Sequence, residues 1–75
     1  MSTMQQTILV FKTNIKYKKD IAKVSSVLRH DAINNWNIDR TDIDCVLRIV
    51  THSLSTNDII QLITNEGYHC SELNN

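Results

Sequence analysis

The side chains best suited to bind metals or to act as nucleophiles are few and scattered in this chain of 75 residues. Its two cysteines, Cys45 and Cys70, lie far apart and form no Cys-x-x-Cys motif. Cys45 falls in register with Leu47 and Ile49, which predicts that it faces the core, and Cys70 shares a strand side with Tyr68. Because free cysteine is among the most frequently buried residues, we expect both to be small core fillers that remain thiols.

Histidine and carboxylate patterns do not indicate a catalytic or metal site either. His30, His52 and His69 have no His-x-x-x-His spacing and no neighbouring cysteine, so we expect capping or surface roles for them. The chain has no Ser-His-Asp arrangement, no paired carboxylates and, with a single glycine, no Gly-rich phosphate loop. We therefore expect neither an enzyme nor a bound cofactor.

The densest cluster of polar side chains is the segment Lys16-Tyr17-Lys18-Lys19, which is followed by Asp20. It precedes a predicted helix, whose free amides and dipole attract anions, so a phosphate or an acidic protein surface could dock there. Alternatively, the lysines are solvated and Tyr17 packs over the core, with the lysine stems on apolar surface. The residues alone leave both interpretations open.

Charge is unevenly distributed, although the formal net charge is zero. Residues 1–30 carry an excess of basic side chains and residues 31–75 an excess of acidic ones. The charged side chains of the first segment are Lys12, Lys16, Lys18, Lys19, Lys23 and Arg29, against Asp20 alone. This pattern predicts one basic and one acidic face, and such faces steer partners more than they determine a fold.

Hydrophobic residues make up 41% of the chain, and its length fits one domain over residues 1–75 with a core at about 6–73. Runs of apolar and β-branched residues predict strands, and apolar residues at helical spacing predict helices. The expected order is strand 7–13, helix 20–32, strand 34–39, strand 45–51, a helix that begins after Ser55, and strand 68–73.

The second helix has the clearest start and stop signals. In Ser55-Thr56-Asn57-Asp58, the serine can accept the Asp58 amide while the aspartate reaches back, which is a capping box. Gly67 stands where a residue in the left-handed region is needed after the helix. The resulting β-α-β-β-α-β order predicts an α+β, ferredoxin-like fold, with a four-stranded antiparallel sheet and two helices on one face.

Five segments in this order and spacing resemble the heavy-metal-associated domain family of copper chaperones and metal-transporting ATPases. The segments are VFKTNIK at 10–16, IAKV at 21–24, NNWNID at 34–39, VLRIV at 46–50 and NDIIQLITNEGY at 57–68. The resemblance covers nearly the whole chain and implies the same ferredoxin-like fold.

That family carries Met-x-Cys-x-x-Cys in the loop before its first helix. With IAKV aligned, Ile15 takes the methionine position and is expected to plug the core, Tyr17 takes the first cysteine position and Asp20 the second. Cu(I) prefers sulfur ligands, and a phenol with a pKa of about 10 is mostly protonated at neutral pH. The resemblance therefore implies a domain that has lost its soft-metal thiol pair, and it carries over no metal ligand.

Three functions follow as hypotheses. The first is a metal-free protein-interaction module, because the family docks its partners through this loop and the first helix; the contact residues would be Lys16, Tyr17, Lys18, Lys19 and Lys23, and the partner would present an acidic face. The alternative is a divergent Cu or Zn carrier or sensor that recruits Cys70, a histidine or a second chain. A weaker third hypothesis is an anion or small-ligand binder at the helix start.

Other partners are not expected. Trp36 is interpreted as a strand packing residue, and only Phe11 could serve as an RNA-stacking aromatic on a central strand, so no nucleic acid is expected. No apolar run approaches the roughly 20 residues of a membrane span, so no membrane insertion is expected. The start MSTMQQT has no basic region before its apolar run, which favours a cytoplasmic chain, and we expect a monomer.

Overall fold

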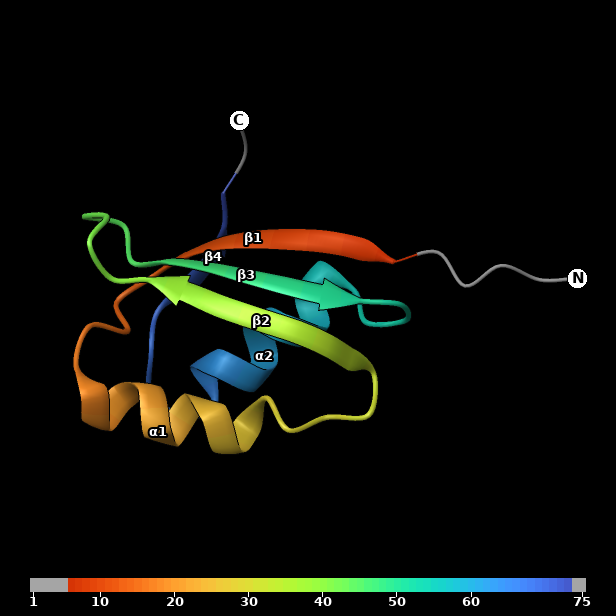
Figure 1. Cartoon of the computed structure of the whole chain (residues 1–75), viewed down its shortest axis with the longest axis horizontal. Coiled ribbons are helices and arrows are strands. Elements are labelled where there is room, and N and C mark those ends of the chain that lie inside the picture. The colour runs from red at the N-terminus through yellow and green to blue at the C-terminus, as the bar shows by residue number, and fades with distance from the viewer. Residues whose placement is uncertain (1–5, 74–75) are drawn as a thin grey trace, which may run out of the picture.

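The computed structural model describes residues 6–73. Its elements are β1 (Thr7–Thr13), α1 (Lys18–Val27), β2 (Ile33–Asp39), β3 (Val46–Thr51), α2 (Thr56–Thr64) and β4 (Cys70–Glu72). The strands form one sheet in the order β2-β3-β1-β4, and every neighbouring pair is antiparallel. Both helices lie on the same face of this sheet (Figure 1). The predicted α+β, ferredoxin-like fold is confirmed.

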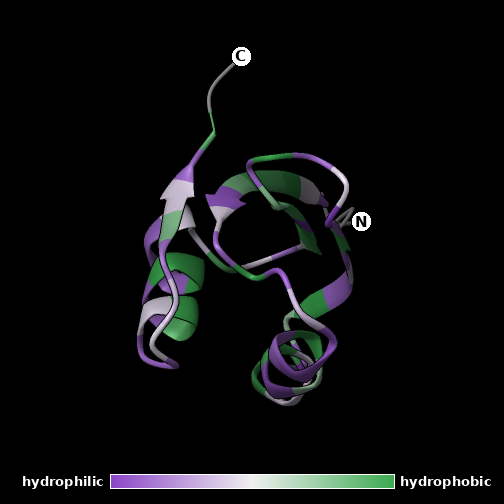
Figure 2. Cartoon of the chain, turned by 90° about the vertical axis from the view of Figure 1, so that its left-hand side faces the viewer, coloured by the Kyte–Doolittle hydropathy of each residue, from purple (hydrophilic) through white to green (hydrophobic). Residues whose placement is uncertain are grey.

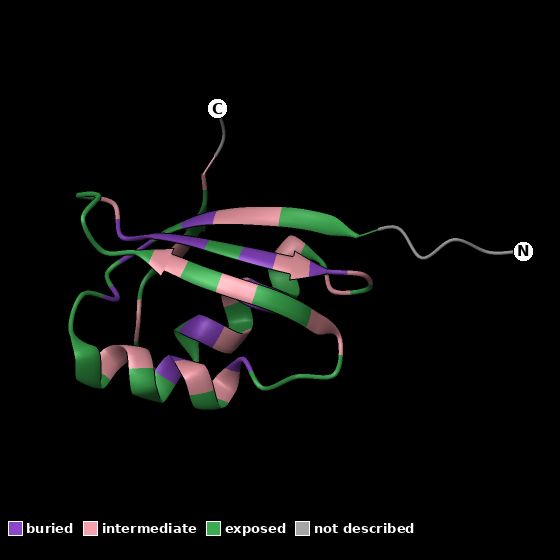
Figure 3. Cartoon of the chain, in the orientation of Figure 1, coloured by how far each residue is buried: buried purple, intermediate pink, exposed green. Residues whose placement is uncertain are grey.

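The core lies between the sheet and the helices (Figure 3). Its fully or nearly fully buried members are Phe11, Ile15, Val24, Leu28, Leu47, Ile49, Ile59 and Ile63. The sheet residues alternate along their strands and the helix residues are spaced by four, so each element turns one apolar side inward. Burying such a side chain contributes about 1.5–3 kcal/mol. Trp36 is half-buried and packs against this cluster, which confirms its interpretation as a packing residue.

The first helix ends earlier than the sequence predicted. It spans Lys18–Val27 instead of 20–32. The Leu28 amide still bonds to the Val24 carbonyl at 2.9 Å, but the chain then turns, and the His30 Nδ1 accepts the Ala32 amide at 3.1 Å. After Leu28 only the small Ala32 falls at helical spacing, so little apolar surface holds further turns on the core.

The second helix follows its predicted signals. Ser55 Oγ accepts the Asp58 amide at 3.2 Å, and the Asp58 carboxylate accepts the Ser55 amide at 2.9 Å. Gly67 has a φ of +91°, as predicted, although it lies two residues beyond the C-cap Asn65. A Cβ at Gly67 would meet no atom within 4 Å, so the demand for glycine is conformational and not steric.

Two strand ends also differ from the prediction. β3 begins at Val46 and not at Cys45, because Cys45 has a φ of +45° that does not fit a strand. β4 covers only Cys70–Glu72 instead of 68–73, and the His69 amide bonds at 2.9 Å to the side chain of Asn14 instead of joining the ladder.

β2 is an edge strand of the sheet. Its Trp36 amide donates to the side-chain oxygen of the preceding Asn35 at 2.8 Å. Within residues 6–73, no helix is long and apolar enough to cross a membrane. The expectation of a cytoplasmic chain rests on residues 1–7, of which 1–5 lie outside the described residues.

Candidate functional site

Three loops meet at the end of the sheet where β1 finishes. They are the β1–α1 loop (14–17), the β2–β3 loop (40–45) and the α2–β4 loop (65–69). Figure 2 looks onto this end of the molecule. Hydrogen bonds join the loops, since the Arg40 guanidinium donates to the Lys16 carbonyl at 3.4 Å and the His69 amide donates to Asn14. We call this region the loop end.

Both carboxylate oxygens of Asp20, the residue that the resemblance aligns with the second cysteine, accept hydrogen bonds from within the protein. One carboxylate oxygen accepts the Tyr17 amide at 3.1 Å, and the other accepts the Tyr68 hydroxyl at 2.9 Å. These contacts fix the start of α1 both to its own loop and to the α2–β4 loop. Asp20 is thus a structural cap, and each of its oxygens already accepts one hydrogen bond from the protein.

The pKa values of this pair shift in opposite directions. The hydrogen bond from Tyr68 lowers the pKa of Asp20, and the Tyr17 and Lys16 amides and the charge of Lys19 add to this effect against the opposing influence of burial. Burial raises the pKa of Tyr68 first, and the hydrogen bond to Asp20 raises it further. The ionised carboxylate and the neutral phenol are therefore the stable partners.

Tyr17, which the resemblance aligns with the first cysteine, is 60% exposed. Its backbone is fixed, because its carbonyl accepts the amides of Asp20 at 2.9 Å and Ile21 at 3.0 Å. The alternative expectation that Tyr17 packs over the core is wrong. Ile15, which precedes it, is completely buried and plugs the core as predicted.

The basic side chains around Tyr17 are all exposed, and these are Lys16, Lys18, Lys19 and Lys23. Lys23 lies one turn into α1, and its ammonium group is 5.8 Å from the centroid of the Tyr68 ring, within the range of a cation–π contact. We call Tyr17 and these four lysines the basic surface. Four of these five residues lie at or just before the first turn of α1, and Lys23 lies in the middle of the helix.

The cysteines do not form a site. Cys45 is 4% exposed, as predicted. Cys70 is only half-buried, although it packs against the core, and burial raises the pKa of its thiol to about 11. β1 runs between the two, since the Thr13 hydroxyl donates to the Cys45 carbonyl at 2.7 Å while Thr13 pairs with Cys70 in the sheet. The two thiols are therefore separated by a strand.

The histidines are also dispersed. His52 shares a hydrogen bond of 2.9 Å with Asn34, His30 closes the turn after α1, and His69 is exposed in the α2–β4 loop. In the described part of the chain, no group of three His, Cys, Asp or Glu side chains could hold a metal ion.

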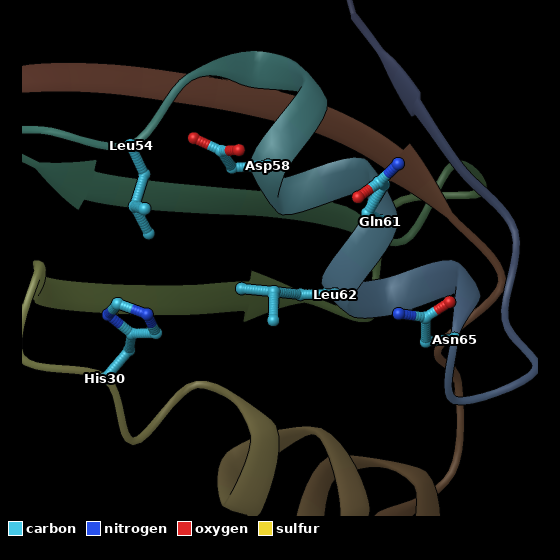
Figure 4. A pocket seen from close by; sticks show the side chains of 6 residues that line it. All are labelled: His30, Leu54, Asp58, Gln61, Leu62 and Asn65. Carbon is cyan, nitrogen blue, oxygen red and sulfur yellow. The ribbon is translucent and has the colours of Figure 1, made fainter.

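A shallow hollow lies between the turn after α1 and the outer side of α2, away from the basic surface. This open depression of about 250 Å³ is lined by His30, Leu54, Asp58, Gln61, Leu62 and Asn65 (Figure 4). Asp58 already serves the capping box, and its pKa is lowered first by the Ser55 amide and hydroxyl and only slightly by the charge of His30. Its polar groups therefore serve the fold more than a ligand.

Sequence reasoning missed Tyr68 and Arg40 as members of the loop end. Tyr68 is 48 positions from Asp20, and Arg40 is 24 positions from the Lys16 carbonyl. The only available signal for Tyr68 was its place directly after Gly67, at the end of the resembling segment 57–68.

Comparison with known proteins supports the class of fold. The sequence matches no protein-family model and no curated protein. The structure is similar to that of a protein described as CsoZ metallochaperone, with a TM-score of 0.75 over 89% of this chain and 99% of that chain, at 17% sequence identity. The chain is thus a small domain with a metallochaperone-like, ferredoxin-like fold.

Proposed function

We propose that this domain is a cytoplasmic protein-interaction module on a metallochaperone-like fold, without catalysis, metal or cofactor. It meets its partner as a monomer, through the basic surface, and the partner presents an acidic face. No nucleic acid or membrane takes part.

The observation that carries the proposal is the state of Asp20. A carboxylate that holds the Tyr17 amide and the Tyr68 hydroxyl has no oxygen left without a protein donor. A metal bound here would compete with two protein donors for the Asp20 oxygens and would lie close to the positive charge of Lys19. Because the loop is already ordered by Asp20, it can present its outer side chains to a protein without a metal.

The composition of the basic surface supports a protein contact. Tyrosine is enriched at interface hot spots because it offers a large, rigid contact area with a polar end, and Tyr17 is 60% exposed on a fixed backbone. The surrounding lysines would mainly raise the association rate with an acidic partner, because exposed charges steer encounters more than they add affinity.

The experiment is site-specific photo-crosslinking from position 17 in living cells, followed by mass spectrometry of the adduct. Because position 17 is itself changed in the double variant Tyr17→Ala/Lys18→Glu, the crosslinker is placed at position 16 for that comparison, and the variant should lose the adduct. Thermal unfolding should show that the variant stays folded. The matched control Ile8→Ala/Arg29→Glu alters an exposed apolar and an exposed basic side chain elsewhere and should keep the adduct. Adducts from the control and the test variant in equal yield would refute the proposed contact surface.

A further inference from the structure

The β2–β3 loop exposes an apolar side chain at the loop end. Ile43 is 95% exposed, more than Tyr17 at 60% or Ile8 at 64%, the other large hydrophobic side chains exposed in the described residues. It stands between Asp42 and Asp44. Leaving an isoleucine side chain in water is unfavourable, and a partner surface would cover it.

The loop that carries Ile43 is rigidly built. The Asp42 carboxylate accepts the Asp44 amide at 2.9 Å, and the Cys45 amide donates to the Asp42 carbonyl at 3.0 Å. The Asp44 carbonyl then accepts the Thr13 amide from β1 at 2.9 Å. Ile43 is therefore held outward by a preorganised loop, so a contact that buries it requires little ordering of the chain.

The Ile43 loop and the basic surface lie next to each other and differ in charge. The loop carries Asp42 and Asp44 together with Arg40, and Asp39 is the last residue of β2 before it. The Arg40 guanidinium turns back to the Lys16 carbonyl, and Asp44 pairs with Lys12 at 3.6 Å. Within the described residues, neither Asp39 nor Asp42 makes an ion pair.

We infer that, when no other partner is present, a second copy of this chain binds the surface formed by the basic surface and the β2–β3 loop together. A two-fold axis at the loop end places the basic surface of one copy against the Ile43 loop of the other, and the same contact is made twice. Each contact sets Lys18 and Lys19 against Asp39 and Asp42, and the pair of contacts covers Tyr17 and Ile43 in both copies. The surface is self-complementary in charge and in its two apolar anchors.

The expected dimer is weak. Two loops and one helix start offer less than the roughly 800 Å² that each partner buries in a standard interface. Exposed ion pairs are screened by salt, so the association should weaken as ionic strength rises. The protein is then a monomer at low concentration. A partner that binds the basic surface would displace the second copy, and only this last clause rests on the proposed function.

The test is a reciprocal charge exchange. Lys18→Glu/Lys19→Glu makes both halves of the surface acidic, and Thr41→Lys/Asp42→Lys makes both halves basic, so neither variant should pair with itself. An equal mixture should pair again, because each acidic half then meets a basic one. Sedimentation and amide NMR from about 10 μM to about 1 mM protein at low salt follow the association, with one variant ¹⁵N-labelled in the mixture.

We expect wild-type shifts at residues 15–20 and 39–45 that grow with concentration, at least about tenfold weaker association in each charge variant, and its return in the mixture. Ile43→Asp should also abolish association, whereas Ile8→Asp should not, which keeps the test valid if Asp42 proves necessary for folding. A wild-type protein that stays monomeric throughout, shifts confined to β2, or a mixture that does not pair would overturn the inference. A crosslinked partner at position 17 would still support the proposed function in each of these cases.

Discussion

The two helices begin in similar ways, and their difference shows how the loop end is built. Each has an aspartate at its third position that accepts the amide of the N-cap residue, Asp20 for Tyr17 and Asp58 for Ser55. At α2 the Asp58 amide also donates to the Ser55 hydroxyl, so the cap is complete within four residues. At α1 the Asp20 amide donates to the Tyr17 carbonyl instead of to a side chain. The second carboxylate oxygen of Asp20 accepts the hydroxyl of Tyr68 from a distant loop.

The start of α2 is therefore held by local hydrogen bonds, and the start of α1 is held in part by a tertiary contact. Both hydrogen bonds of the α2 cap lie within four consecutive residues. The α1 cap depends on the packing of the α2–β4 loop, and in return it holds that loop against the basic surface. Changes at α1 should therefore spread to other loops, whereas changes at α2 should stay local.

The largest expected effect is a gain of metal binding. Tyr17→Cys/Asp20→Cys replaces the tertiary cap by the thiol pair of the resembling family, and Cu(I) should bind it in competition with a chelator that keeps the wild-type protein metal-free. Amide shifts should cluster at residues 15–22. Tyr17→Cys alone is the control and should bind far more weakly. Specific shifts of the wild-type protein with micromolar Cu(I) or Zn(II) would support the divergent carrier instead.

The next effect is on stability. Asp20→Ala should lower the free energy of unfolding more than Asp58→Ala, because it removes a cap and also leaves the Tyr68 hydroxyl without its acceptor. Urea unfolding of both variants measures the difference. Equal losses would mean that the bond to Tyr68 adds nothing and that the two helix starts are equivalent.

The pKa values of Asp20 and Asp58 should respond differently to the loss of the Tyr68 hydroxyl. The pKa of Asp20 lies below its usual 3.8, so the stability it contributes is present above about pH 4 and is lost as the pH falls through the lowered value. Tyr68→Phe removes the largest cause of the shift and should raise the pKa of Asp20 but not that of Asp58, which is also lowered, by Ser55. NMR titration of both carboxyl groups provides the measurement, and a parallel change at Asp58 would contradict it.

The smallest effects concern the N-cap side chains themselves. Ser55→Ala should cost about 1 kcal/mol, since the hydroxyl that accepts the Asp58 amide is lost. Tyr17→Ala should change stability by less than about 0.5 kcal/mol, because an exposed phenol is removed and the backbone cap remains. A larger loss for Tyr17→Ala would show that the phenol serves the fold and weaken its assignment as an interface anchor.

The sequence predicted those features that depend on neighbouring residues. The element order, the Ser55 cap and the left-handed Gly67 follow from short patterns, the burial of Ile15 follows from the family resemblance, and the structure confirms all four. It did not predict the left-handed Cys45, because the alternation with Leu47 and Ile49 reads as one continuous strand. The stop of α1 at Val27 was missed as well, because helix ends depend on what the core can still hold.

For the candidate site, the residues were predictable and their roles were not. The family register placed Tyr17 and Asp20 at the loop before the helix, whereas the structure has Tyr17 as the N-cap of α1 and Asp20 in its first turn. That Asp20 is held by Tyr68, and that Arg40 joins the β2–β3 loop to the Lys16 carbonyl, are contacts between distant segments. No local pattern encodes such contacts, because they exist only after the sheet and helices have packed.

The hydrogen bond between Asn35 and the Trp36 amide affects how readily the β2 edge can pair with another chain. β2 is a seven-residue edge strand without proline or lysine, which is the kind of strand that recruits other chains into aggregates. The Asn35 side chain occupies a main-chain donor that an incoming strand would need. One asparagine thereby favours solubility over strand addition at this edge, and it leaves association to the loops, where charge can keep it reversible.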